Sequence, residues 1–143
     1  MIKEKKIKPI EYLLKQKSYI KSFYDCFECK IRGKTLYCYG EITPTDYSRT
    51  YKCRIKYKFG SVPEVTIMEP EIDYDFSAHM YKYKKLCLYD PREQPWSREY
   101  LIADTIIPWL AEWLVYYELY QITGKWEGPE APHEEVDKES VKE

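Results

Sequence analysis

The stretch that decides the fold is Tyr51-Lys52-Cys53-Arg54-Ile55-Lys56-Tyr57-Lys58-Phe59, near the middle of the 143-residue chain. Aromatic or apolar residues alternate with Lys or Arg throughout. Successive side chains of a β-strand point to opposite faces, so the alternation predicts a strand with one buried face and one cationic face in water. Such strands are typical of antiparallel sheets.

Three shorter runs predict the partners of this strand. Residues 27–31 form a possible strand, residues 35–43 a clearer one, and residues 63–68 a short one. Short turns, the first at Gly33, separate them. We therefore expect a four-stranded antiparallel meander across residues 27–69.

Helical patterns flank the predicted sheet. Residues 9 to about 24 predict an amphipathic helix with Pro9 in its first turn. The apolar side chains expected to share its buried face are Ile10, Leu13, Leu14, Ile20 and Phe23.

A second helical pattern runs from Arg98 to about Thr123 and is apolar on most sides in its later part. Pro108 must kink or split this helix near Thr105, because proline lacks the N–H that an inner helical position needs. Gly124 is a natural stop. We expect the later part to pack against the sheet.

The order of elements is helix, sheet, irregular segment and helices, which predicts an α+β domain with helices segregated from the sheet. This domain should cover residues 9–126. Residues 1–8 form a basic leader, and residues 127–143 carry seven acidic residues and two Lys, an end we expect to be mobile. The irregular segment, residues 71–96, has a length more typical of functional than of idle loops.

Charge is distributed unevenly along the chain. Residues 1–60 hold 15 Lys and Arg against 6 Asp and Glu, whereas residues 61–143 hold 8 against 18. An acidic second half argues against a simple nucleic-acid-binding protein. The asymmetry suits an oriented protein partner, or has no specific meaning.

Other features concern the compartment and small ligands. The start of the chain is too polar for a signal peptide, and the five cysteines are an odd number, so we expect a reducing cytoplasm. Two His make a rich metal site unexpected, and we expect no cofactor. The most apolar stretch, residues 105–119, is too short to span a bilayer.

Cys87 is the candidate nucleophile. It lies in the irregular segment, in Lys84-Lys85-Leu86-Cys87-Leu88-Tyr89-Asp90-Pro91, and the two lysines would favour its thiolate if they point toward it. His79, eight residues upstream, is the candidate acid–base or orienting partner. From the spacing alone, a cysteine flanked by Leu86 and Leu88 is more often a residue that only fills the core.

The other cysteines are expected to pack. Cys38 and Cys53 fall on the buried phase of their strands. Cys26 and Cys29 form a Cys-x-x-Cys pair that allows a redox or half-zinc site, but no second pair exists, so packing at the start of a strand is preferred.

The order of these elements and motifs resembles the ubiquitin-conjugating enzyme family. Val62-Pro63-Glu64-Val65 is similar to its proline-containing strand, His79 to the start of its His-Pro-Asn motif, and Trp96-Ser97 to the opening of its next helix. Leu86-Cys87-Leu88 is similar to the surroundings of its active cysteine. Met80 and Tyr81 replace the Pro and Asn of that motif, which leaves stabilisation of the oxyanion to another group.

A divergent bacterial branch is closer still. Its pattern is similar to His79-x-Tyr81, Leu86-Cys87-Leu88-Tyr89-x-Pro91, and Thr123-Gly124-Lys125-Trp126 followed by His133. Such proteins occur in bacterial conjugation operons, including antiphage systems in which a conjugating domain modifies the C-terminus of a cGAS-like nucleotidyltransferase.

The resemblance implies that Cys87 forms a thioester with the C-terminus of a protein, either a cGAS-like nucleotidyltransferase or a ubiquitin-like modifier, and passes it to an amine. His79 would orient the loop or move a proton, and His133 could join it if the tail folds back. The chain has no room for an ATP-using domain, so either a separate enzyme supplies the activation or the chemistry differs, with a mixed disulfide at Cys87 as the alternative. The alternative is a non-catalytic binding module that scaffolds a protein partner; a nucleic-acid binder with a cationic sheet face is third.

Overall fold

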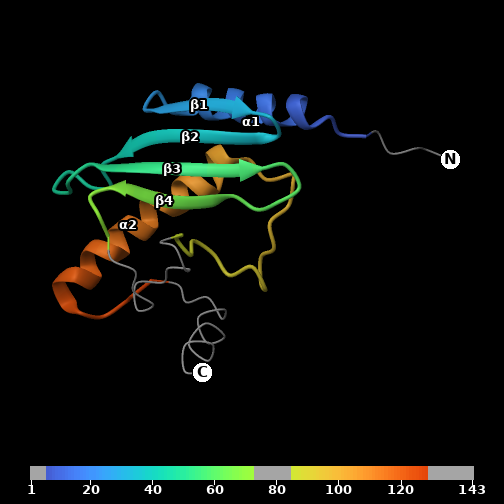
Figure 1. Cartoon of the computed structure of the whole chain (residues 1–143). Coiled ribbons are helices and arrows are strands. Elements are labelled where there is room, and N and C mark those ends of the chain that lie inside the picture. The colour runs from blue at the N-terminus through green and yellow to red at the C-terminus, as the bar shows by residue number, and fades with distance from the viewer. Residues whose placement is uncertain (1–5, 73–84, 129–143) are drawn as a thin grey trace.

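The computed structural model describes residues 6–72 and 85–128 (Figure 1). Two helices and four strands follow one another along the chain, with a short 3₁₀ helix, η3, before the second helix. Their bounds are α1 Pro9–Phe23, β1 Phe27–Arg32, β2 Thr35–Ile42, β3 Tyr51–Lys58, β4 Glu64–Glu69, η3 Ile102–Asp104 and α2 Ile106–Thr123.

The strands form one antiparallel sheet in the order β1-β2-β3-β4, which confirms the predicted meander. The alternation in β3 is confirmed too, because Tyr51, Cys53, Ile55 and Tyr57 are all buried. Gly40 in β2 lies under the ring of Phe27. A β-carbon there would come within 2.5 Å of that ring, so only glycine fits without displacing it.

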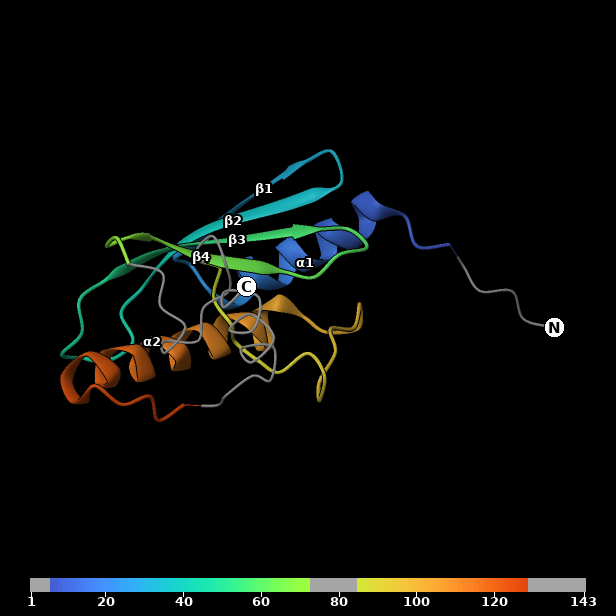
Figure 2. The ribbon, with the colours of Figure 1, turned by 60° about the horizontal axis from the view of Figure 1, so that its bottom comes forward.

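Both helices lie on one face of the sheet, and Figure 2 shows them beneath it. The core between the layers combines the inner face of the sheet with the buried side of α2, including Leu110, Trp113 and Leu114. Neither described helix covers the other face of the sheet, which is toward the viewer in Figure 1 and is called the outer face below. The predicted α+β class is confirmed, and the arrangement is consistent with a ubiquitin-conjugating-like fold.

The buried face of α1 differs from the predicted one. Leu13, Gln16 and Ile20 are buried, whereas Ile10, Leu14 and Phe23 are exposed. The buried residues are spaced three and four apart, so they form one stripe. The prediction was wrong at these positions because Gln16, a polar residue, occupies the centre of the stripe.

The predicted start of the second helix at Arg98 was also wrong. Residues 98–100 form a turn, and α2 begins at Ile106. Pro108 therefore lies in the first turn of α2, where the missing N–H costs nothing. The predicted split near Thr105 is confirmed, and the helix ends at Gly124, which has φ 77° and donates its N–H to the Tyr120 carbonyl at 2.7 Å. Neither described helix has both the length and the apolarity needed to cross a membrane.

Candidate active site around Cys87

The main chain just before Cys87 is fixed to the edge of the sheet. Lys85 forms an isolated antiparallel bridge with Thr66 in β4, and the N–H of Leu86 donates to the Val65 carbonyl at 2.8 Å. The Leu86 side chain is buried in the core. Lys85 and Leu86 thus pair with β4 like the start of a fifth strand. This pairing fixes the position of the backbone at Cys87.

The Cys87 side chain is buried, with 6% of its surface exposed. Its thiol donates a weak hydrogen bond to the Tyr89 carbonyl, with Sγ and O 3.9 Å apart. The Tyr89 ring packs against Trp109 of α2 at 5.2 Å between centroids. Burial, and then the proximity of Cys87, raise the pKa of the Tyr89 phenol, so this neighbour stays neutral and offers a hydroxyl proton.

Two lysines, Lys84 and Lys85, precede Cys87, and only Lys85 lies within the described residues. The Lys85 ammonium lies 3.2 Å from the Glu64 carboxylate, which compensates its charge. Lys85 was expected to favour the thiolate of Cys87, but its ammonium is already paired with Glu64.

The chain after Cys87 turns sharply and then binds β3. The Asp90 carboxylate accepts the N–H of Arg92 at 2.9 Å, and the Asp90 carbonyl accepts that of Gln94 at 2.9 Å. Two residues later, the Trp96 indole N–H donates to the Tyr57 hydroxyl at 2.9 Å. The segment that carries Cys87 is thus held by β4 on one side and by β3 on the other.

The bond to Tyr57 belongs to a directed chain of hydrogen bonds. The Tyr12 hydroxyl donates its one proton to the Arg98 carbonyl at 2.9 Å. Tyr57, 3.0 Å from the Tyr12 oxygen, must therefore donate to it and accept from Trp96. Burial and the Tyr57 contact raise the pKa of Tyr12, which keeps this chain neutral.

Gln16 completes this polar network from the buried stripe of α1. Only 2% of its surface is exposed, yet its amide is fully used. Its nitrogen donates to the Tyr100 carbonyl at 2.8 Å and to Tyr12 at 3.1 Å, and its oxygen accepts the N–H of Ile102 at 3.0 Å. The apolar pattern of α1 did not predict this role of Gln16, whose one signal in the sequence is a polar residue at the spacing of the buried stripe.

The other candidate residues divide between the core, the surface and the part of the chain that is not described. Cys29, Cys38 and Cys53 are buried in the sheet, which confirms that they pack there. Cys26 is exposed, so the prediction that it packs was wrong. His79 and His133 lie outside the described residues, as do Met80 and Tyr81. Within residues 6–72 and 85–128, no group of three metal-ligating side chains comes together.

We predict that the sheet cysteines differ sharply in reactivity. Burial raises the pKa of Cys53 to about 12, so its reactive thiolate is scarce at pH 8, whereas Cys26 is exposed. Iodoacetamide should label Cys26 within minutes and leave Cys53 unmodified until the protein unfolds, as peptide mass spectrometry would show. Equal labelling rates in the folded protein would contradict the burial of Cys53.

Residues 16–134 match the protein-family model for "Type II CBASS E2 protein". No curated protein matches the chain. The matched range includes the four strands, α2, Cys87, and both Gln16 and Trp96 of the polar network. Because the match covers most of the chain, the protein belongs to the Type II CBASS E2 family.

Proposed function

We propose that the protein is a conjugating enzyme whose nucleophile is Cys87. Membership of the family indicates a conjugation-related role in antiphage defence. The observation that supports Cys87 is its placement: it lies on a segment anchored to β4 through Leu86 and to β3 through Trp96. Among the described cysteines, three others are buried in the sheet and Cys26 lies at its surface.

In the proposed first step, the Cys87 thiolate attacks the activated carboxyl at the C-terminus of a protein. A carbon–sulfur bond forms, and the activating group leaves with its electron pair. A substrate amine then attacks the thioester, so that a carbon–nitrogen bond forms, the thiolate leaves, and the amine loses a proton. In this proposal a separate enzyme supplies the activated carboxyl; the alternative is a different covalent link at Cys87, such as a mixed disulfide.

The substrate and the helper residues extend the proposal. Following the resemblance, the modified protein is a cGAS-like nucleotidyltransferase joined through its C-terminus, or a ubiquitin-like modifier. His79 orients the loop or takes the amine proton, and His133 is a second candidate for this role. Tyr89 lies two residues after Cys87, and burial raises the pKa of its phenol, so it is a candidate donor to an oxyanion formed at Cys87.

The test is the chemical nature of an adduct on the wild-type protein, recovered from its native host without reductant. Intact mass spectrometry should show a protein-sized adduct that survives a thiol-free phosphine and is released by neutral hydroxylamine, as a thioester requires. Release by the phosphine alone would indicate a mixed disulfide and would contradict acyl transfer.

A non-catalytic binding module is the second candidate. The 6% exposure of Cys87 favours it, because a nucleophile must meet its acyl donor. A module of this kind would co-purify with its partner without a covalent adduct and would keep that partner after replacement of Cys87.

A further inference from the structure

Five cations gather at the end of the outer sheet face where β1 turns into β2. Strand register places Lys30, Tyr37 and Lys56 in one row across the strands, and Arg32, Thr35 and Lys58 in the next. Lys34 lies in the turn itself. We call these cations, Lys30, Arg32, Lys34, Lys56 and Lys58, the hairpin patch.

None of the five pairs with a described acidic residue. Other lysines of the sheet do pair: Lys52 lies 3.1 Å from Glu69, and Lys85 lies 3.2 Å from Glu64. Glu64 of β4 lies in register opposite Lys56, but its carboxylate pairs with Lys85, so the hairpin patch keeps an excess of positive charge. Such a region attracts an oppositely charged partner.

The patch borders a groove lined by side chains that can donate hydrogen bonds to an anion. Lys30, Arg32, Tyr37 and Tyr39 line this groove. Within the described part of the chain, neither phenol has a hydrogen-bonding partner, and Tyr39 is 44% exposed. The lysine ammonium, the arginine guanidinium and the tyrosine hydroxyl all donate hydrogen bonds to carboxylate oxygens. Arginine can donate two such bonds to one carboxylate at once.

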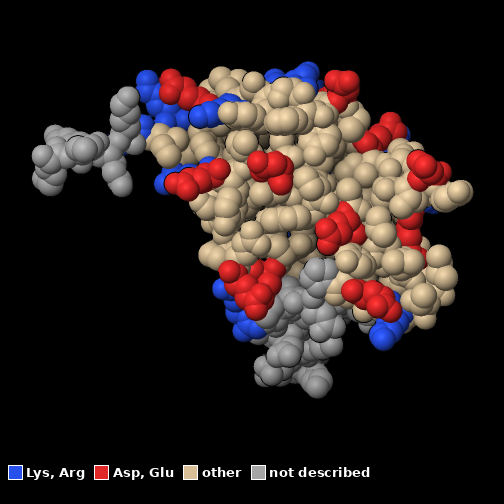
Figure 3. Space-filling model, turned by 180° about the vertical axis from the view of Figure 1, so that it is seen from behind, with Lys and Arg blue, Asp and Glu red and all other residues tan. Residues whose placement is uncertain are grey.

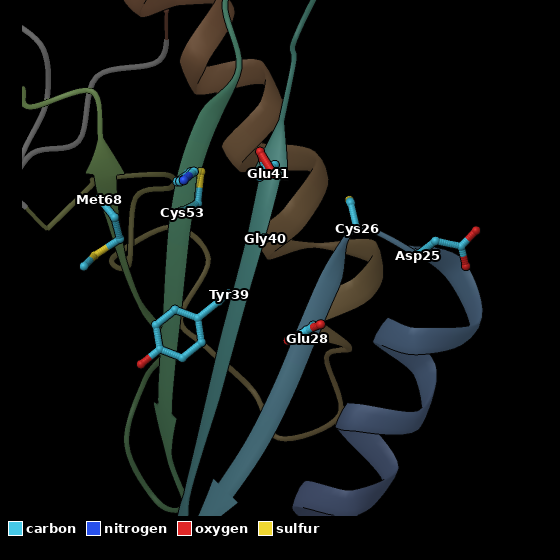
Figure 4. A pocket seen from close by; sticks show the side chains of 9 residues that line it. Asp25, Cys26, Glu28, Tyr39, Gly40, Glu41, Cys53 and Met68 are labelled. Atoms are coloured by element: carbon cyan, nitrogen blue, oxygen red, sulfur yellow. The ribbon is translucent and has the colours of Figure 1, made fainter.

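The rest of the same face limits what fits. A second pocket, which shares Tyr39 with the groove, is lined by Asp25, Glu28 and Glu41, and its Lys52 is already paired with Glu69 (Figure 4). A polyanion laid along the whole face would meet these carboxylates, whereas a short acidic segment that stays on the hairpin side of Tyr39 would not. Seen from the helix side, Lys and Arg side chains lie mostly toward the edges of the molecule, and Asp and Glu side chains are scattered between them (Figure 3).

We propose that the hairpin patch is a docking surface for a short acidic segment of a protein partner, whose carboxylates enter the groove beside Tyr37 and Tyr39. The surface lies on β1 to β3 of the outer face, whereas Cys87 follows the bridge to β4. Docking there is noncovalent and needs no thiol. It stands or falls independently of the chemistry proposed for Cys87.

The test uses a fluorescent peptide of alternating Glu and Ser, about twelve residues long, and the full-length protein. Anisotropy titrations at about 50 and 200 mM NaCl would compare wild type with Lys30→Glu/Arg32→Glu. The matched control is Lys15→Glu/Lys21→Glu, which makes the same change in net charge at exposed positions of α1. Thermal unfolding would show that all three proteins are folded.

We expect the groove variant to bind the peptide at least about tenfold more weakly and the α1 variant to bind within about twofold of wild type. Affinity should also fall at the higher salt concentration. Equal losses in both variants, or no binding to wild type, would overturn the proposal. Tighter, groove-dependent binding of single-stranded poly-dT than of the peptide would overturn it in favour of a nucleic acid.

Discussion

Gln16→Leu is expected to lower the free energy of unfolding by about 2–4 kcal/mol, although leucine is the more apolar residue. Gln16 is buried and bonds the Tyr100 carbonyl, the Ile102 N–H and the Tyr12 hydroxyl. Leucine would fill the space but leave these groups without their partner. An unsatisfied buried polar group costs about 1–3 kcal/mol, and the losses here share one network, so they will not simply add.

The matched control is Gln121→Leu in α2. Gln121 also donates to a tyrosine four residues away, Tyr117, at 2.8 Å, but it does so at the surface. Water replaces that bond, so the change should stay within about 0.5 kcal/mol. Urea unfolding, monitored by tryptophan fluorescence, measures the free energy of unfolding of both variants. A Gln16→Leu protein as stable as wild type would contradict the structural role of the network.

Cys87→Ala is expected to abolish transfer to an amine acceptor while leaving the unfolding transition close to that of wild type. Alanine removes the sulfur that carries the acyl group, and loss of a catalytic nucleophile costs about 10³-fold or more in rate. The lost packing should cost about 1 kcal/mol, because the side chain is small. A gel-shift assay with the host partners and a thermal melt measure the two effects.

Cys26→Ala is the matched control for transfer. Cys26 is a free cysteine like Cys87, but it is exposed and lies just before β1. This variant should transfer at the wild-type rate. Equal losses for both variants would indicate a general requirement for thiols, and unchanged transfer by Cys87→Ala would remove Cys87 from the mechanism.

The sheet could be predicted from the sequence because its signal is local. Each residue of β3 alternates in type with its neighbours, and the side chains of the strand alternate between core and water in the same phase. The buried stripe of α1 was harder to predict, because Gln16 forms its hydrogen bonds with Tyr100 and Ile102, which lie far along the chain. Apolar patterns do not identify a polar residue that is buried with its hydrogen bonds satisfied.

The candidate site was predictable only in part. The sequence singled out Cys87 by its surroundings and by resemblance, but not the bonds that fix its segment. Trp96 and Tyr57 lie 39 residues apart, and Tyr12 and Arg98 lie 86 apart, so no local pattern joins them. Likewise, the charges of β1 to β3 form one patch only when strand register aligns them.

The central claim, that Cys87 accepts an acyl group from a protein C-terminus, is tested most directly with Cys87→Ser in the native host. Serine would trap the acyl group as an oxyester, which thiol reagents do not cleave. Intact mass spectrometry after reduction should show a protein-sized adduct on Cys87→Ser and none on Cys87→Ala, and the added mass would identify the modifier. Absence of an adduct on wild type and on Cys87→Ser, with partners still co-purifying, would contradict the claim and favour a binding module.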